Sequence, residues 1–282
     1  MCVYRCDSVA TSVTIISAGR HVQFRQFLKD LWDYRELFLT FVQRDIKVRY
    51  KQTALGVIWV ILQPLFMVGA FSLIFGKIAR MPTDGLPYTM FYIAAIVPWN
   101  TFATALSQSA LSMESHAHLI SKVYFPRMVV PGGIVCGSFV DFGIAFGLMN
   151  GLAIYLGHWD WRLLPLAPLL LLIQALTALG IGLALAILNA QYRDVKHAVG
   201  FLVQVFMLAT PVIYPLSRLP QWAQDWAFLN PMAVVVTTYR DVLKGETLDF
   251  RLLTLAFATS IAYLAFGIWF FRKREARLAD VL

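Results

Sequence analysis

The sequence has 282 residues, of which 59% are hydrophobic and only 14% are charged, and its mean hydropathy is +0.65. These values lie outside the range of an ordinary soluble domain. The net charge is +8, but the basic residues flank apolar runs instead of forming one cluster, which argues against nucleic-acid binding. Three cysteines supply neither a disulfide framework nor a metal site of the usual ligand number. The composition therefore predicts a membrane protein.

Two segments precede the first long apolar run. Residues 1–23 lack the apolar core of a signal peptide and are expected to be a disordered start. Residues 24–53 carry apolar side chains at intervals of three and four, with charged residues over much of the other face. This pattern predicts an amphipathic helix in the membrane interface, with its apolar side toward lipid. The alternative, a soluble helix packing on a second domain, has no such domain in this chain.

Six nearly uncharged runs follow, at residues 54–76, 88–112, 128–156, 163–189, 198–214 and 252–271. All but the fifth reach the ~20 residues that a helix needs to cross ~30 Å of hydrocarbon. The fifth spans the membrane only if its helix continues past Pro211. We therefore predict an all-α membrane protein with a six-helix domain at residues 54–271. In the third run, Gly143, Gly147 and Gly151 suggest a face for close helix packing.

The distribution of basic residues predicts the orientation. Sixteen Lys and Arg residues fall on the side that includes both ends of the six-helix domain, against seven on the other side. Because basic residues near span ends are retained in the cytoplasm, both termini are predicted to be cytoplasmic. Residues 272–282 would then form a basic cytoplasmic tail.

Asp141 is the one charged residue inside the six runs. An intramembrane carboxylate is by default a candidate functional residue. Two interpretations stay open: a structural Asp bonded to a polar neighbour such as Gln174 or Asn150, or a residue on a translocation path. The runs offer no second charged side chain for a proton relay, which argues against proton-coupled transport.

Residues 215–244, between the fifth and sixth runs, contain several prolines and predict two short helices. Trp222 and Trp226 lie one turn apart, as in the aromatic girdle of an outer interface. One interpretation is a re-entrant gate at the outer mouth of a pathway, since irregular backbone at membrane depth must be buried or line a cavity. The other is an ordinary periplasmic loop.

Catalytic motifs are missing from the sequence. It contains no GxxxxGK[ST] phosphate loop, no GxSxG, no HExxH and no suitably spaced aqueous acid pair. His116 and His118 form an HxH pair, but without further ligands a solvated loop is favoured over a metal site. We expect transport, with no catalytic residue, metal or cofactor on this chain.

Several motifs carry a family resemblance. The run Arg44–Trp59, followed by Gln63-Pro64, resembles the N-terminal signature of ABC-2 type permeases that export polysaccharides and polyol phosphates. Further matches occur in the family's order, at Leu119–Arg127, Tyr192–Val195, Pro211–Tyr214, Asn230–Pro231 and Arg240.

The resemblance implies a half-transporter. Its expected partners are a second copy of the chain, two copies of a nucleotide-binding ATPase subunit that holds ATP and Mg, membrane lipids, and a lipid-linked glycan. The glycan, of O-antigen, capsule or teichoic-acid type, would cross the bacterial inner membrane. A coupling loop at residues 114–127 would dock on the ATPase through Glu114, Leu119, Ile120, Lys122, Tyr124, Phe125, Pro126 and Arg127. The amphipathic helix would be a second contact, through Arg44, Asp45, Lys47, Arg49 and Tyr50.

The transported glycan needs a wide path, and aromatic faces suit sugar rings. The channel candidates are Trp59, Phe66, Phe71, Trp99, Phe206, Tyr214 and Asp141, with lipid-facing packing as the alternative for each aromatic ring. The outer-gate candidates are Pro215, Pro220, Trp222, Trp226, Asn230, Pro231 and Arg240. Two other functions stay open. An ABC-2 exporter of a drug or small amphiphile is disfavoured by the Arg44–Trp59 signature, and a membrane enzyme of glycolipid assembly by the lack of aqueous catalytic carboxylates.

Overall fold

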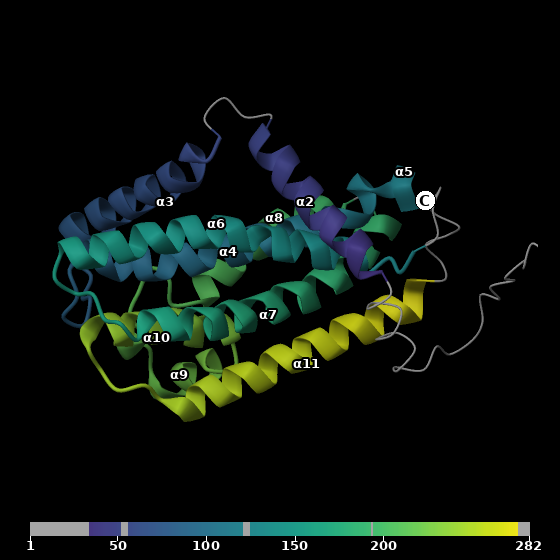
Figure 1. The fold of residues 1–282 in the computed structure, drawn as a ribbon. Helices are drawn as coiled ribbons and strands as arrows, with labels where there is room; N and C mark the ends of the chain where they lie inside the picture. The colour runs from purple at the N-terminus through teal and green to yellow at the C-terminus, as the bar shows by residue number, and fades with distance from the viewer. Residues whose placement is uncertain (1–33, 52–55, 121–124, 193, 276–282) are drawn as a thin grey trace, which may run out of the picture.

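The computed structural model describes residues 34–51, 56–120, 125–192 and 194–275, and every regular element in these ranges is helical. Four long helices run side by side along the molecule (Figure 1): α4 (Tyr88–Ser115), α6 (Val129–Tyr155), α7 (Leu163–Gln191) and α11 (Phe250–Glu275). Helix α11 packs on α7, α7 on α4, and α4 on α6. The all-α prediction is confirmed, and α4 lies at the centre of the packing.

Five helices in the described ranges are long and apolar enough to cross a membrane. The fifth is α3 (Ile58–Phe71), which continues as a π-helical segment, η1 (Ser72–Ile78). The five differ widely in how much of their most apolar 18-residue stretch is buried inside the structure. The buried share is 78% in α4, but 22% in α11 and 11% in α3 with η1. Of these five, helix α3 is therefore the span with the least burial against the rest of the chain.

Helix α8 (Val195–Ala209) has 15 residues, which cover only about 22 Å at 1.5 Å per residue. It ends where Thr210 turns to extended backbone, with φ −97° and ψ 137°. A residue that precedes proline is driven out of the helical region by the proline ring. The continuation past Pro211 that a sixth full-length span requires is therefore not made.

The bundle is drawn together at small residues. A Cβ atom on Gly267 of α11 would lie only 2.1 Å from the carbonyl oxygen of Gly180 in α7. Gly143, Gly147 and Gly151 have nothing within 4 Å of an added Cβ in the described part of the chain. The glycine spacing in α6 thus did not identify the packing face within this subunit.

Short helices occupy the two ends of the bundle (Figure 1). Helix α2 (Arg35–Lys51) and α5 (Ala117–Ile120) lie at one end, and α9 (Gln221–Ala227) and α10 (Pro231–Lys244) lie at the other. Two short helices, α9 and α10, thus follow the fifth run, and their role as a gate stays a prediction. A single 3-10 turn, η2 (Leu216–Arg218), precedes them. Helix α10 packs against α4, α7 and α11, and most of its side chains are buried.

Candidate functional site

Helix α2 docks on the N-terminal half of α6 in a regular register. Three α2 residues spaced four apart meet three α6 residues spaced four apart: Phe41 with Gly133, Asp45 with Gly137, and Arg49 with Asp141. Glycine permits this approach, because a Cβ atom on Gly133 would lie 3.2 Å from the Cβ of Phe41. Phe41 is 7% exposed. The amphipathic pattern of this segment thus packs its central apolar residue on protein, where we expected lipid.

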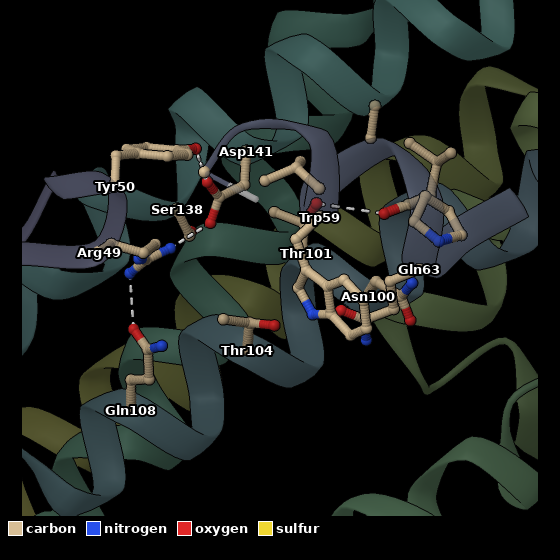
Figure 2. Close-up of a pocket in the computed structure, with 15 residues that line it drawn as sticks. Arg49, Tyr50, Trp59, Gln63, Asn100, Thr101, Thr104, Gln108, Ser138 and Asp141 are labelled. Carbon is tan, nitrogen blue, oxygen red and sulfur yellow. Dashed lines mark hydrogen bonds and ion pairs between the residues drawn. The ribbon is translucent and has the colours of Figure 1, made fainter. Parts of the chain in front are cut away.

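Beyond the glycine contacts, polar side chains fasten α2 to two spans (Figure 2). The Arg49 guanidinium donates hydrogen bonds to Asp141 of α6, to Asp45 Oδ2 at 2.7 Å and to Gln108 Oε1 of α4 at 2.6 Å. The Tyr50 hydroxyl donates to the other oxygen of Asp141. Burial, with this hydrogen bond, raises the pKa of Tyr50, so the hydroxyl keeps its proton.

In the structure, Asp141 accepts hydrogen bonds from Arg49 and Tyr50. Its partners come from the segment before the first span, whereas Gln174 and Asn150 were the neighbours we considered. The Arg49 and Asp141 side chains are only 18% and 19% exposed, so the ion pair is well shielded from solvent. Arg49 joins α2, α4 and α6 at one point, which makes the cluster a three-helix junction.

A cavity of about 250 Å³ opens beside this junction, between α3, α4 and α6. Its lining is rich in uncharged polar groups from all three helices, namely Gln63, Asn100, Thr101, Thr104, Gln108 and Ser138. The α4 residues Asn100, Thr104 and Gln108 recur every four positions and therefore share one helix face. Our sequence reasoning missed this row. Its signal was present, because such spacing inside an apolar run marks a face that avoids lipid.

The aromatic channel candidates lie in different surroundings. Trp59 lines the cavity and is 52% exposed, and Phe66 is 66% exposed on the outside of α3. Trp99 is 3% exposed, with its ring centroid 6.1 Å from that of Phe206. Phe71 packs edge-on against other rings inside the subunit. The structure therefore brings Trp59 and Asp141 to one site and leaves the other candidates elsewhere.

At the α2 end of the bundle, the start of α6 is tied to two neighbouring helices. The Phe125 ring is 4% exposed and lies 5.6 Å from the ring of Phe41. Arg127 donates a hydrogen bond of 3.0 Å to the carbonyl oxygen of Glu275 at the end of α11. The predicted coupling loop is thus in direct contact with α2.

Other predicted residues of this end are placed as follows. Glu114 forms an ion pair with Lys196 of α8 at 3.6 Å and accepts a hydrogen bond from Asn189 of α7. Leu119 is half-buried, and α5 ends at Ile120. Pro126 is half-buried, Arg44 and Lys47 are exposed on α2, and Lys122 and Tyr124 lie outside the described residues.

His116 follows α4, and its ring centroid lies 5.9 Å from that of Phe41, edge to face. Burial lowers the pKa of His116, although a contact with the carbonyl of Ser112 opposes this effect. The half-buried imidazole is therefore favoured in its neutral form. In the described ranges, no three His, Cys, Asp or Glu side chains gather in a way that suits a metal ion.

At the other end of the bundle, Arg240 of α10 binds the residues that follow the end of α8. Its guanidinium donates to the carbonyl oxygens of Pro211 at 2.6 Å, Val212 at 2.8 Å and Phe91 at 3.2 Å. It also lies 3.5 Å from the centroid of the Phe91 ring, and Arg240 is 3% exposed. A buried guanidinium thus binds carbonyl groups of the irregular segment that follows α8 and of α4.

The neighbouring gate candidates complete this end. Asn230 caps α10 by accepting from the Met232 amide, and its Nδ2 donates to Thr210 Oγ1 at 2.9 Å. The Tyr214 hydroxyl donates to the carbonyl of Leu208. Pro215 and Pro220 precede η2 and α9, Pro231 begins α10, and Trp222 and Trp226 are 69% and 70% exposed. Motifs far apart in sequence therefore meet where α8 stops.

Comparison with known proteins identifies the family. The pattern of the family described as ABC-2 type transporter matches residues 36–244. The chain belongs to the ABC-2 type transporter family. This ABC-2 protein is 30% identical to the O-antigen export system permease protein RfbA of Myxococcus xanthus over 258 residues, which cover 90% of this chain and 98% of that protein.

More distant relatives align over most of their length as well. An O-antigen export system permease protein RfbA of Klebsiella pneumoniae is 27% identical over 253 residues, 88% of this chain and 95% of that protein. The polysialic acid transport protein KpsM of Escherichia coli is 22% identical over 240 residues, 82% of this chain and 91% of that protein. The ABC-2 chain is therefore similar to permeases of two kinds of polysaccharide system.

Proposed function

We propose that this chain is the non-catalytic, membrane-spanning subunit of an ATP-driven exporter that moves a lipid-linked, O-antigen-like polysaccharide across the bacterial inner membrane. The observation that carries the proposal is the near full-length similarity to an O-antigen export permease, with 98% of that protein covered. The family signature at Arg44–Trp59 also supports the proposal, because it contains Arg49 and Tyr50, which form the three-helix junction with Asp141.

The exporter is a homodimer that carries two ATPase subunits. Support for a dimer comes from α3 and α8, which leave large apolar side chains exposed, among them Phe66 at 66% and Phe201 at 65%. In α8, Val199 is the one buried residue. Two such faces, brought together, would enclose a path between the subunits. The lipid-linked glycan would pass along this path.

Energy enters at the end of the bundle where α2 and α5 lie, with both termini on the cytoplasmic side. The ATPase docks on residues 114–127 and on the exposed face of α2, where Arg44 and Lys47 lie. Support comes from the contact between Phe125 and Phe41, which joins the two docking elements into one unit. The outer gate comprises α9 and α10, with α8 and these helices together forming the sixth membrane passage.

Deletion of the gene, followed by complementation, tests the proposal. In the deletion strain, we expect surface polysaccharide to be lost and polymer to accumulate inside the cell on its lipid carrier, because the path across the inner membrane is gone. Wild-type protein should restore export and should co-purify with an ATPase at equal stoichiometry. The Arg127→Glu variant, which changes the coupling loop, should insert into the membrane normally but export poorly. Undiminished surface polysaccharide in the deletion strain would refute the proposal.

A further inference from the structure

The cavity beside the three-helix junction has a lining that does not suit lipid. Asn100, Thr104 and Gln108 project from one face of α4, and Gln63 projects from α3 (Figure 2). Arg49 occupies the Gln108 oxygen, whereas the amides of Asn100 and Gln63 make no hydrogen bond within the described part of the chain. Amides at membrane depth are costly unless water or a polar ligand satisfies them.

Charge restricts the ligand that the cavity accepts. Among the described residues that line the cavity, Arg49 is the one cation, and it faces two carboxylates, Asp45 and Asp141. One cation against two carboxylates leaves an excess of negative charge, which repels a phosphate or an acidic sugar. Both terminal nitrogens of Arg49 are already occupied by these contacts. The cavity therefore favours an uncharged ligand that carries hydroxyl groups.

Size and shape restrict the ligand further. The cavity of about 250 Å³ would hold about eight waters at ~30 Å³ each, which is about the room that one sugar ring requires. The indole of Trp59 forms one wall and is 52% exposed. An indole face packs well against the C–H groups of a pyranose, while amides and hydroxyls on the opposite wall bond to its hydroxyl groups.

We propose that the cavity between α3, α4 and α6 is a binding site for one uncharged pyranose unit of the exported glycan. This inference rests on the proposed export function and deepens it. Trp59 stacks on the sugar ring, Asn100 and Gln63 bond to its hydroxyls through their amides, and Thr104 bonds through its hydroxyl. The site holds a sugar at membrane depth, away from the phosphates of the lipid carrier.

Photocrosslinking in cells that make the glycan tests the site directly. The complete transporter carries p-benzoylphenylalanine in place of Trp59, and the matched control carries it in place of Phe266 of α11, which is similarly exposed at 53%. After irradiation, we expect a sugar-bearing adduct at position 59 that exceeds the control about tenfold, and no such adduct in a strain that cannot begin the glycan. Adducts that carry only acyl lipid at position 59, or equal sugar signals at both positions, would overturn the proposal.

A second pair of variants does not depend on the bulky probe. Thr104→Val removes the hydroxyl at nearly constant volume, and Thr104→Ser retains it. We expect Thr104→Val to slow export about three- to tenfold, the value of one lost hydrogen bond, and Thr104→Ser to export like wild type. Equal export by both variants at equal abundance would also overturn the site. The deletion strain separates the two proposals, because lost export with no sugar adduct contradicts the site alone, whereas normal export contradicts the exporter itself.

Discussion

The junction around Arg49 makes an asymmetric prediction about its two ends. Asp141→Asn retains the size of the side chain and its bond to Tyr50, and Arg49 retains Asp45 and Gln108. Arg49→Ala, in contrast, leaves two carboxylates close together with no cation between them. Although the two substitutions break the same ion pair, we therefore expect Arg49→Ala to be much the more damaging.

The magnitudes follow from burial. Breaking a fully buried pair by removing one partner costs about 3–5 kcal/mol. Since the Arg49 and Asp141 side chains are 18% and 19% exposed, we reduce this to about 2–3 kcal/mol for Arg49→Ala. Asp141→Asn weakens a hydrogen bond and should cost about 1 kcal/mol. At about 2–4 °C per kcal/mol, the midpoints of thermal unfolding should fall by about 4–12 °C for Arg49→Ala and about 2–4 °C for Asp141→Asn.

Thermal unfolding of the purified protein in lipid nanodiscs, followed by tryptophan fluorescence, measures these shifts. The double variant Arg49→Ala with Asp141→Asn is the informative control. It removes one of the stranded carboxylates, so it should be more stable than Arg49→Ala alone, and the double-mutant cycle should show a favourable coupling. Equal losses for the two single variants, or additive losses in the double variant, would refute the charge argument.

Three further predictions concern other contacts. Gly267→Val should cost about 3 kcal/mol in thermal stability and reduce abundance, because its side chain meets the Gly180 carbonyl, whereas Gly143→Val, with open space around it, should change stability by less than ~0.5 kcal/mol. Burial lowers the pKa of His116, so its neutral form should stabilise the fold fully above the unfolded pKa of ~6.5, and this stabilisation should decline as the pH falls below that value. Thermal scans should therefore show a weaker acid dependence in His116→Phe than in the wild type. Arg240→Lys should lose about 3 kcal/mol and most export, since an ammonium group cannot reach all the carbonyls at the end of α8.

Hydropathy alone located most of the fold. A run of apolar residues must either cross the bilayer or be buried, so long apolar helices could be predicted from local sequence. The described ranges contain five helices that are long and apolar enough to cross a membrane. Local rules also explain the exception. Pro211 forces Thr210 out of helical geometry, and this stops α8 after Ala209. The shorter element was therefore encoded in the sequence, although the conditional prediction left the end of the helix open.

Partners across long sequence separations could not be predicted in the same way. Arg49 and Asp141 are 92 positions apart, and nothing in either segment names the other. Their contact depends on the packing of α2 along Gly133 and Gly137. The sequence around these glycines does not distinguish them from Gly143, where an added Cβ atom would meet nothing within 4 Å in the described chain. Tertiary packing, rather than local pattern, selects which glycine faces a helix.

The packing also determines which part of the permease moves at least cost. Arg49 fixes α2 to α4 and α6, whereas only 11% of the most apolar 18-residue stretch of α3 and η1 is buried. Among the five spans of the described ranges, α3 therefore loses the least apolar contact with its own chain when it is displaced. Just before α3, Gly56 has a φ of 51°, a left-handed conformation that glycine adopts without strain. In the proposed exporter, movement of the coupling loop would thus leave α2 and α6 together and tilt α3. This tilt would open or close the polar cavity that α3 lines.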